Sequence, residues 1–95
     1  MPMTRYTVYF GGHVQGVWFR ATAQRLAAGR DVAGYVRNLP DGQVLLVAEG
    51  TQEVLAALIA DIDAAMEGNI QEKRIDETPA TGEFGDPGDG LTIHR

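Results

Sequence analysis

One stretch near the amino terminus, residues 11–20, has the residue types and spacing of a phosphate-binding loop and reads GGHVQGVWFR. It follows an alternating, strand-like run and ends where a helix is expected to begin. Backbone N–H groups of a tight loop and of a first helical turn converge on one point and attract negative charge. The guanidinium of Arg20 adds a planar cation that can bind two phosphate oxygens at once, which a lysine cannot reproduce. The stretch therefore predicts an anion site with Arg20 at its end.

Two better-known phosphate sites do not fit this stretch. Gly11 and Gly16 match the glycine spacing of a P-loop, but Val17 and Trp18 stand where a lysine and a serine or threonine are needed. The dinucleotide-binding pattern G-x-G-x-x-G is also absent. The chain contains no cysteine, so a thiolate nucleophile is excluded. The sequence thus argues against a nucleoside triphosphatase and against cysteine-dependent catalysis.

A second stretch, residues 34–44, reads GYVRNLPDGQV and predicts a strand, a tight turn and the start of another strand. Pro40, Asp41 and Gly42 supply the turn chemistry. Asn38 then stands at the end of a strand, where its side chain can project from the rim of the sheet. An amide donates and accepts hydrogen bonds but does not titrate, so Asn38 could align a water molecule without acting as its base.

Together the two stretches resemble the signatures of the acylphosphatase family, which read close to G-x-V-Q-G-V-x-F-R and G-x-V-x-N-x-x-D-G-x-V. Both are present in order and at the expected separation. The resemblance extends over residues 6–95 and is specific between Gly12 and Gly50. The glycine-rich stretch 78–90 and the ending 91–95 are the least typical parts, and they lie away from Arg20 and Asn38.

The resemblance implies an enzyme that hydrolyses the carboxyl–phosphate bond of small acyl phosphates, with no metal, no cofactor and no phosphoenzyme. It implies that loop amides and the guanidinium of Arg20 hold the phosphoryl group, while Asn38 orients the attacking water. An acyl phosphate already carries a good leaving group, so positioning and charge stabilisation can do most of the work. The residues expected to bind the phosphate are Gln15, Gly16, Val17, Trp18, Phe19 and Arg20.

Some assignments stay open beside this one. His13 borders the loop, and a surface or structural role is its better interpretation. No Cys or His cluster has metal-ligand spacing, so we expect no metal site. Trp18 either flanks the acyl group of a substrate or shields the loop. A non-enzymatic module that binds a small phosphorylated ligand or assists a partner protein is the alternative function, and the presence of both Arg20 and Asn38 favours the enzyme.

The composition bounds the class of protein. A chain of 95 residues, 44% of them hydrophobic, predicts one globular domain over residues 1–95. The net charge of −5 argues against general nucleic-acid binding, which needs a basic face. The sequence shows no secretory signal and no apolar stretch long enough to span a membrane. We therefore expect a cytoplasmic protein without disulfides, and nothing in the sequence demands more than a monomer.

The hydrophobic pattern predicts the elements that position the two signatures. The clearest is a helix from about residue 51 to 67, whose apolar residues recur on one face. The other expected elements are a strand at 6–10, a helix at 21–28, a hairpin of 33–38 and 43–49, an edge strand at 69–77, a loop at 78–90 and a strand at 91–93. The order βαββαβ with a short extra strand predicts an α+β, ferredoxin-like sandwich, in which two helices cover one face of an antiparallel sheet.

Overall fold

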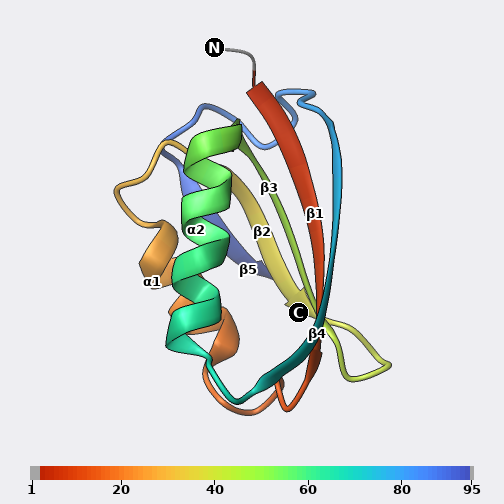
Figure 1. The fold of residues 1–95 in the computed structure, drawn as a ribbon. Helices are drawn as coiled ribbons and strands as arrows, with labels where there is room; N and C mark the ends of the chain where they lie inside the picture. Colours follow the sequence, from red (N-terminus) through yellow and green to blue (C-terminus); the bar gives the residue numbers. More distant parts are fainter. Residues whose placement is uncertain (1–2, 95) are drawn as a thin grey trace.

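A computed structural model of the chain describes residues 3–94 and contains one five-stranded sheet with two helices on one face (Figure 1). The elements in chain order are β1 (Met3–Gly12), α1 (Phe19–Ala27), β2 (Ala33–Asn38), β3 (Val44–Thr51), α2 (Gln52–Ala65), β4 (Ile70–Pro79) and β5 (Gly90–His94). The predicted ferredoxin-like α+β sandwich is confirmed. Neither helix within residues 3–94 has the length and apolar composition needed to cross a membrane.

The strands are ordered β4-β1-β3-β2-β5, and the first four run antiparallel to their neighbours, as predicted. The short last strand differs, because β5 pairs with β2 in parallel. The chain leaves β4 at one edge, crosses the end of the sheet in the loop 80–89 and returns along the opposite edge (Figure 1). Strand β5 therefore runs in the opposite direction to β4 and in the same direction as β2.

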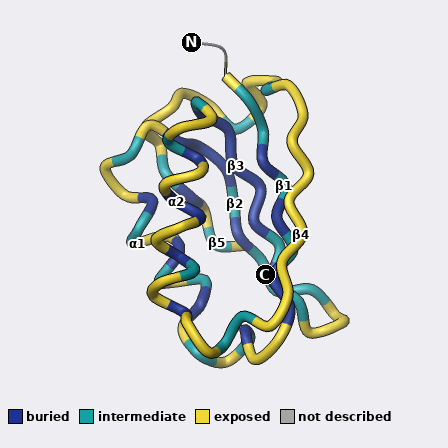
Figure 2. The backbone as a smooth tube through the Cα atoms, in the orientation of Figure 1, coloured by how far each residue is buried: buried dark blue, intermediate teal, exposed yellow. Residues whose placement is uncertain are grey.

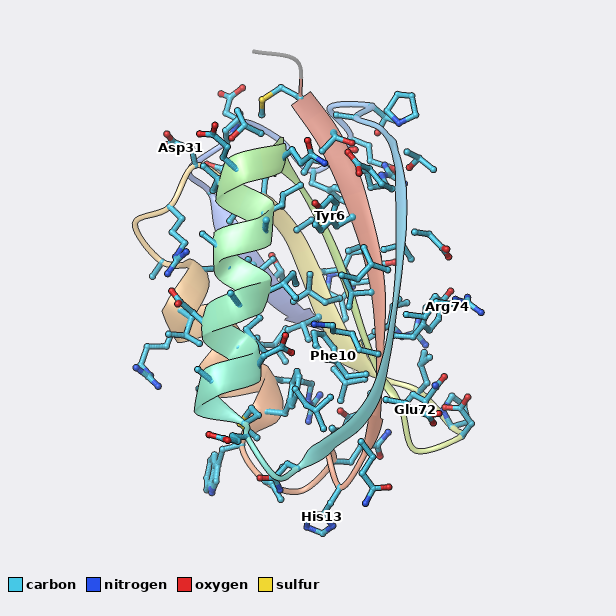
Figure 3. All side chains as sticks on the ribbon, viewed as in Figure 1. Tyr6, Phe10, His13, Asp31, Glu72 and Arg74 are labelled. Atoms are coloured by element: carbon cyan, nitrogen blue, oxygen red, sulfur yellow. The ribbon has the colours of Figure 1, made fainter. Side chains whose placement is uncertain are left out.

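The core lies between the sheet and the two helices, where the tube in Figure 2 is coloured as buried. Alternate residues of β1 point into it, and Tyr6 and Phe10 lie between the sheet and α2 in Figure 3. From α2, Leu55, Leu58 and Ile62 are almost completely buried. Removal of each such side chain from water stabilises the fold by about 1.5–3 kcal/mol. The predicted apolar face of this helix is thus the face that packs on the sheet.

The two helices begin for different local reasons. The hydroxyl of Thr51 accepts a hydrogen bond from the Val54 amide at 3.3 Å and caps α2. Helix α1 begins at Phe19, earlier than the predicted start at Ala21, directly after Trp18 in the left-handed region with φ 64°. Arg20 therefore belongs to the first turn of α1, and its position is set by the helix rather than by a free loop.

Candidate active site

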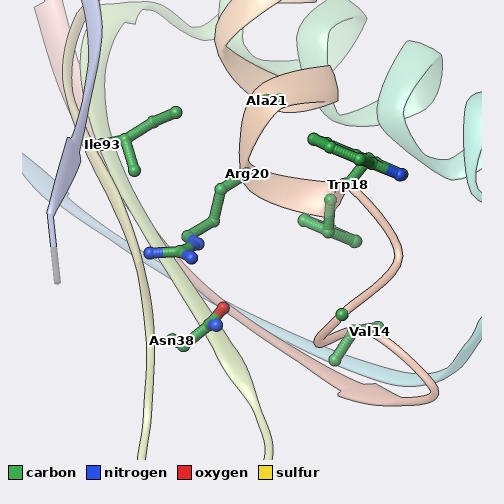
Figure 4. A pocket seen from close by; sticks show the side chains of 8 residues that line it. Val14, Trp18, Arg20, Ala21, Asn38 and Ile93 are labelled. Atoms are coloured by element: carbon green, nitrogen blue, oxygen red, sulfur yellow. The ribbon is translucent and has the colours of Figure 1, made fainter.

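A cavity of about 370 Å³ lies at one rim of the sheet, where the loop after β1, the first turn of α1 and the ends of β2 and β5 meet (Figure 4). Its lining combines polar groups with a larger apolar surface. The lining residues are Val14, Gly16, Trp18, Phe19, Arg20, Ala21, Asn38 and Ile93. Both signature stretches of the sequence therefore contribute to one cavity.

The loop after β1 is fastened on one side to the turn that follows α2. The His13 amide donates to the Asn69 carbonyl oxygen at 2.9 Å, and the Asn69 side chain donates back to the His13 carbonyl oxygen at 3.0 Å. Gly12 precedes this link with φ 119°, where a Cβ would lie 2.5 Å from the Asn69 carbonyl oxygen. Only a glycine fits that close approach, so Gly12 fixes the direction in which the loop leaves β1.

On its other side the loop is fastened to the β2–β3 turn by Gln15. Its side-chain amide donates to the carbonyl oxygens of Leu39 and Gln43, each at 2.8 Å. Gln15 was expected among the phosphate-binding residues, but its side chain is directed to the turn and does not line the cavity. Val17 is also outside the lining and packs partly buried against the core. These two side chains hold the loop, while Gly16, Trp18, Phe19 and Arg20 border the cavity.

Arg20 reaches the cavity because the residue before it is anchored in the core. Phe19 is 2% exposed, and its ring packs on that of Phe10 with centroids 4.9 Å apart. Arg20 then extends from the first turn of α1 toward Asn38 (Figure 4). Its Nη1 donates to the carbonyl oxygen of His94 at 3.1 Å, so the last strand orients the guanidinium.

Asn38 reaches the same cavity from the end of β2. Side chains alternate along a strand, so Asn38 shares the helix-facing side of the sheet with the buried Val36. The turn that follows is closed by the Leu39 amide donating to the Gln43 carbonyl oxygen at 2.8 Å and by the Asp41 side chain accepting from the Gln43 amide at 2.9 Å. This turn chemistry, read from the sequence, determines where the strand ends and therefore where Asn38 stands.

The cavity has the electrostatics of an anion site. Arg20 is the one charged residue among those that line it. The first intrahelical hydrogen bond of α1 runs from the Thr22 amide to the Trp18 carbonyl oxygen at 2.9 Å, so the N–H groups of residues 19–21 precede the first helical donor and have no acceptor within the helix. They add the positive end of the helix dipole. No His, Cys, Asp or Glu lines the cavity.

Other residues considered in the sequence lie elsewhere. His13 is exposed and projects from the end of the molecule (Figure 3), outside the lining of the cavity. Within residues 3–94, no group of three or more His, Cys, Asp or Glu side chains is placed to hold a metal ion. Sequence reasoning missed Val14, Ala21 and Ile93 as lining residues. Ile93 carried no signal, because only the pairing of β5 with β2 brings it to the cavity.

The fold and this cavity define a class of protein, an α+β sandwich with a pocket at one rim whose one charged lining residue is Arg20. Its family follows from sequence comparison, because the family model described as Acylphosphatase matches residues 6–87. An acylphosphatase of Marinobacter nauticus is 40% identical over 87 residues, which cover 90% of this chain and 95% of that protein. One of Methylococcus capsulatus is 55% identical over 58 residues, which cover 61% of this chain and 63% of that protein, slightly less than two thirds of its length. The chain belongs to the acylphosphatase family, as its two signatures predicted.

Solved structures agree with the sequence comparison. The crystal structure of acylphosphatase from Bacillus subtilis matches with a TM-score of 0.84 at 26% identity, covering 97% of this chain and 99% of that one. The structure of HypF from T. kodakarensis matches with a TM-score of 0.77 at 29% identity, covering 97% of this chain but 12% of the larger protein. The same sandwich therefore occurs both as a separate chain and as a small part of a longer one.

Proposed function

We propose that this cavity hydrolyses small acyl phosphates to a carboxylate and inorganic phosphate, the reaction expected of a member of the acylphosphatase family. The observation that carries the proposal is that Arg20 and Asn38, from two separate signatures, line one cavity. A cation that can bind two phosphoryl oxygens and an amide that can hold a water are thereby placed next to each other (Figure 4).

In the proposed mechanism, Arg20 and the N–H groups of the loop and of the first turn of α1 bind the phosphoryl oxygens. They stabilise the negative charge that is spread over those oxygens in the transition state. Asn38 holds a water in line with the bond from phosphorus to the acyl oxygen. The water oxygen forms a bond to phosphorus while the bond from phosphorus to the acyl oxygen breaks. The carboxylate leaves with the electron pair of the broken bond.

The proton of the attacking water passes to a phosphoryl oxygen in this mechanism. The lining of the cavity includes no His, Cys, Asp or Glu, so none of its side chains is suited to act as a general base. The leaving carboxylate is a weak base and needs no protonation. Positioning and charge stabilisation then supply the acceleration, and the mechanism needs no metal.

We infer further that the protein acts as a cytoplasmic monomer in which residues 1–95 form one domain. The absence of cysteine and the ordinary globular composition support this inference. The net charge of −5 supports a small anion as the ligand rather than a nucleic acid, because positive potential is needed only locally, at Arg20.

The test is hydrolysis of benzoyl phosphate by the purified protein in excess chelator. We expect rapid turnover by the wild type and a loss of about 10²–10³-fold or more in Arg20→Ala and in Asn38→Ala. Arg25→Ala is the matched control, because Arg25 is an exposed arginine in the last turn of the same helix. If the folded wild-type protein showed no turnover, the assignment as an enzyme would give way to that of a ligand-binding module. Full activity in both site variants would overturn the assigned residues.

A further inference from the structure

Trp18, the single tryptophan of the chain, is a large apolar residue that lies largely in solvent. It is 82% exposed. The other large hydrophobic residues exposed within residues 3–94, Met3 and Ile75, are 37% and 41% exposed and lie outside this cavity. A scattered exposed apolar residue needs no explanation. Trp18 is different because it lines the cavity.

The backbone holds Trp18 at this rim in a conformation that bulky residues rarely adopt. Its φ and ψ are 64° and 21°, in the left-handed region, and it is the one residue other than glycine with a positive φ within residues 3–94. The next residue, Phe19, is buried against Phe10. The loop thus turns Phe19 into the core and leaves the indole outside, and strain of this kind collects at functional sites.

The lining of the cavity has polar and apolar parts. Arg20 and Asn38 are polar, whereas Trp18, Ala21 and Ile93 supply apolar surface. In Figure 4, Trp18 and Ile93 lie on opposite sides of Arg20, and the indole nitrogen is on the side of the ring away from Arg20. An acyl phosphate likewise has two parts, an anionic phosphoryl group that Arg20 and Asn38 can bind and an acyl group that apolar surface can contact. The volume of about 370 Å³ exceeds what the phosphoryl group fills.

We propose that Trp18 is the specificity-determining residue of this site and that it selects acyl phosphates with a flat aromatic acyl group. This inference rests on the proposed function, because it requires the phosphoryl group to be bound at Arg20. An indole face packs on an aromatic ring by offset or edge contacts with centroids about 4.5–7 Å apart. A methyl group, as in acetyl phosphate, covers too little of that face to gain from it.

The test compares kcat/KM for benzoyl phosphate and acetyl phosphate in the wild type, Trp18→Ala and Trp18→Phe. The kcat/KM of each variant is divided by that of the wild type for the same substrate, which removes the different intrinsic reactivities of the two compounds. We expect Trp18→Ala to lose about tenfold with benzoyl phosphate, equivalent to about 1.4 kcal/mol and near the upper range for one aromatic contact. The loss with acetyl phosphate should be less than about twofold. Trp18→Phe should recover most of the preference, and Ile75→Ala is the control for removing an exposed apolar side chain elsewhere.

Inhibition by inorganic phosphate separates recognition of the acyl group from damage to the loop. Trp18→Ala keeps the backbone N–H at this position, so the inhibition constant of phosphate should change much less than kcat/KM for benzoyl phosphate does. Equal losses with both substrates, or an equally large weakening of phosphate inhibition, would mean that Trp18 only shapes the loop and would overturn the proposal. Unchanged kinetics with both substrates would overturn it as well.

A binding measurement keeps the inference distinct from the proposed function. Trp18 is the only tryptophan, so its fluorescence reports on the site directly. Benzoylphosphonate and acetylphosphonate resist hydrolysis and serve as probes. We expect benzoylphosphonate to change the fluorescence at a lower concentration than acetylphosphonate does. If the wild type turns over neither substrate but shows this difference, the proposed reaction fails while aromatic recognition stands. Equal titrations with both probes would refute the role of Trp18.

Discussion

Arg20 donates through Nη1 to the backbone carbonyl oxygen of His94 at 3.1 Å, across 74 positions of sequence. The acceptor is neutral, so the positive charge of the guanidinium is oriented without being cancelled. A guanidinium carries five N–H donors in a rigid fork. One hydrogen bond to the last strand therefore leaves enough donors for two phosphoryl oxygens, in an orientation that strand β5 fixes.

Arg20→Lys tests whether this geometry matters beyond the charge. A lysine keeps the charge but loses the rigid fork, so it cannot both donate to His94 and bind two phosphoryl oxygens in a fixed plane. We expect kcat/KM for benzoyl phosphate to fall about 10²-fold or more, and inhibition by inorganic phosphate to weaken. Circular dichroism checks that the variant is folded. A lysine variant within about twofold of the wild type would show that a point charge is sufficient.

Asn38→Ala separates catalysis from binding. The proposed role of Asn38 is to hold the water, so its loss should lower kcat about 10²–10³-fold while the inhibition constant of phosphate changes little. Asn38→Asp should lower both turnover and phosphate affinity, because a carboxylate beside the phosphoryl group repels it. The measurement is steady-state kinetics with phosphate as a competitive inhibitor. A large loss of phosphate affinity in the alanine variant would assign Asn38 to binding instead.

Gln15→Ala should reduce activity although the side chain does not line the cavity. The substitution removes both hydrogen bonds to the Leu39 and Gln43 carbonyl oxygens, which join the loop to the turn after Asn38. We expect a loss of about 1–3 kcal/mol in the free energy of unfolding. Looser placement of Asn38 against Arg20 should also cost about tenfold or more in kcat/KM.

The control for Gln15 is Gln52→Ala, because Gln52 makes a long hydrogen bond to Glu77 at 3.4 Å and does not line the cavity. It should leave kcat/KM unchanged. Denaturant unfolding and kinetics are measured on the same preparations. Equal activity of the Gln15 and Gln52 variants would show that the link between loop and turn does not control the site.

Much of the fold follows from local sequence patterns. The expected strand 33–38 coincides with β2, and the expected helix from about 51 to 67 contains α2. Both depend on turn residues and on a regular apolar spacing, which act within a few positions. The start of α1 at Phe19 was not predictable in the same way, because Trp18 adopts a left-handed conformation that a bulky residue seldom takes.

The remaining features depend on contacts between distant parts of the chain. Parallel pairing of β5, and with it the place of Ile93 in the cavity, is decided by the path of the loop 80–89 across the sheet. Gly34 belongs to the second signature, and the structure gives a reason for it: a Cβ there would collide with the carbonyl oxygen of Val47 on β3. The burial of Glu49 also depends on distant contacts, because a charged residue is expected at the surface when only the sequence is known.

Glu49 on β3 holds the start of the loop 80–89 against the sheet face opposite the helices. It is 5% exposed and accepts hydrogen bonds from Arg5 Nε at 2.9 Å and from the Thr81 and Gly82 amides at 2.8 and 2.9 Å. Arg5 also pairs with Glu83 of the same loop. Burial raises the pKa of Glu49, but the hydrogen bonds from Thr81, Gly82 and Arg5 more than offset this, so its pKa lies below the ordinary value.

A lowered pKa in the folded state links this carboxylate to acid stability. The unfolded chain binds a proton on this group near pH 4.3, at about the ordinary pKa of glutamate. The stabilisation is therefore fully present above that pH and is lost as the pH falls through the lower pKa of the folded state. Denaturant unfolding of the wild type should show a falling free energy of unfolding below about pH 4.

Glu49→Gln should remove part of that acid dependence, because the amide does not titrate. At pH 7 we expect the variant to be less stable by about 1–3 kcal/mol, since an amide cannot satisfy the same donors. Its kcat for benzoyl phosphate should stay near that of the wild type, because Glu49 pairs with Ala33, whereas Asn38 pairs with Val44 at the other end of β2. Parallel stability curves of variant and wild type between pH 7 and pH 2.5 would show that other carboxylates carry the acid dependence.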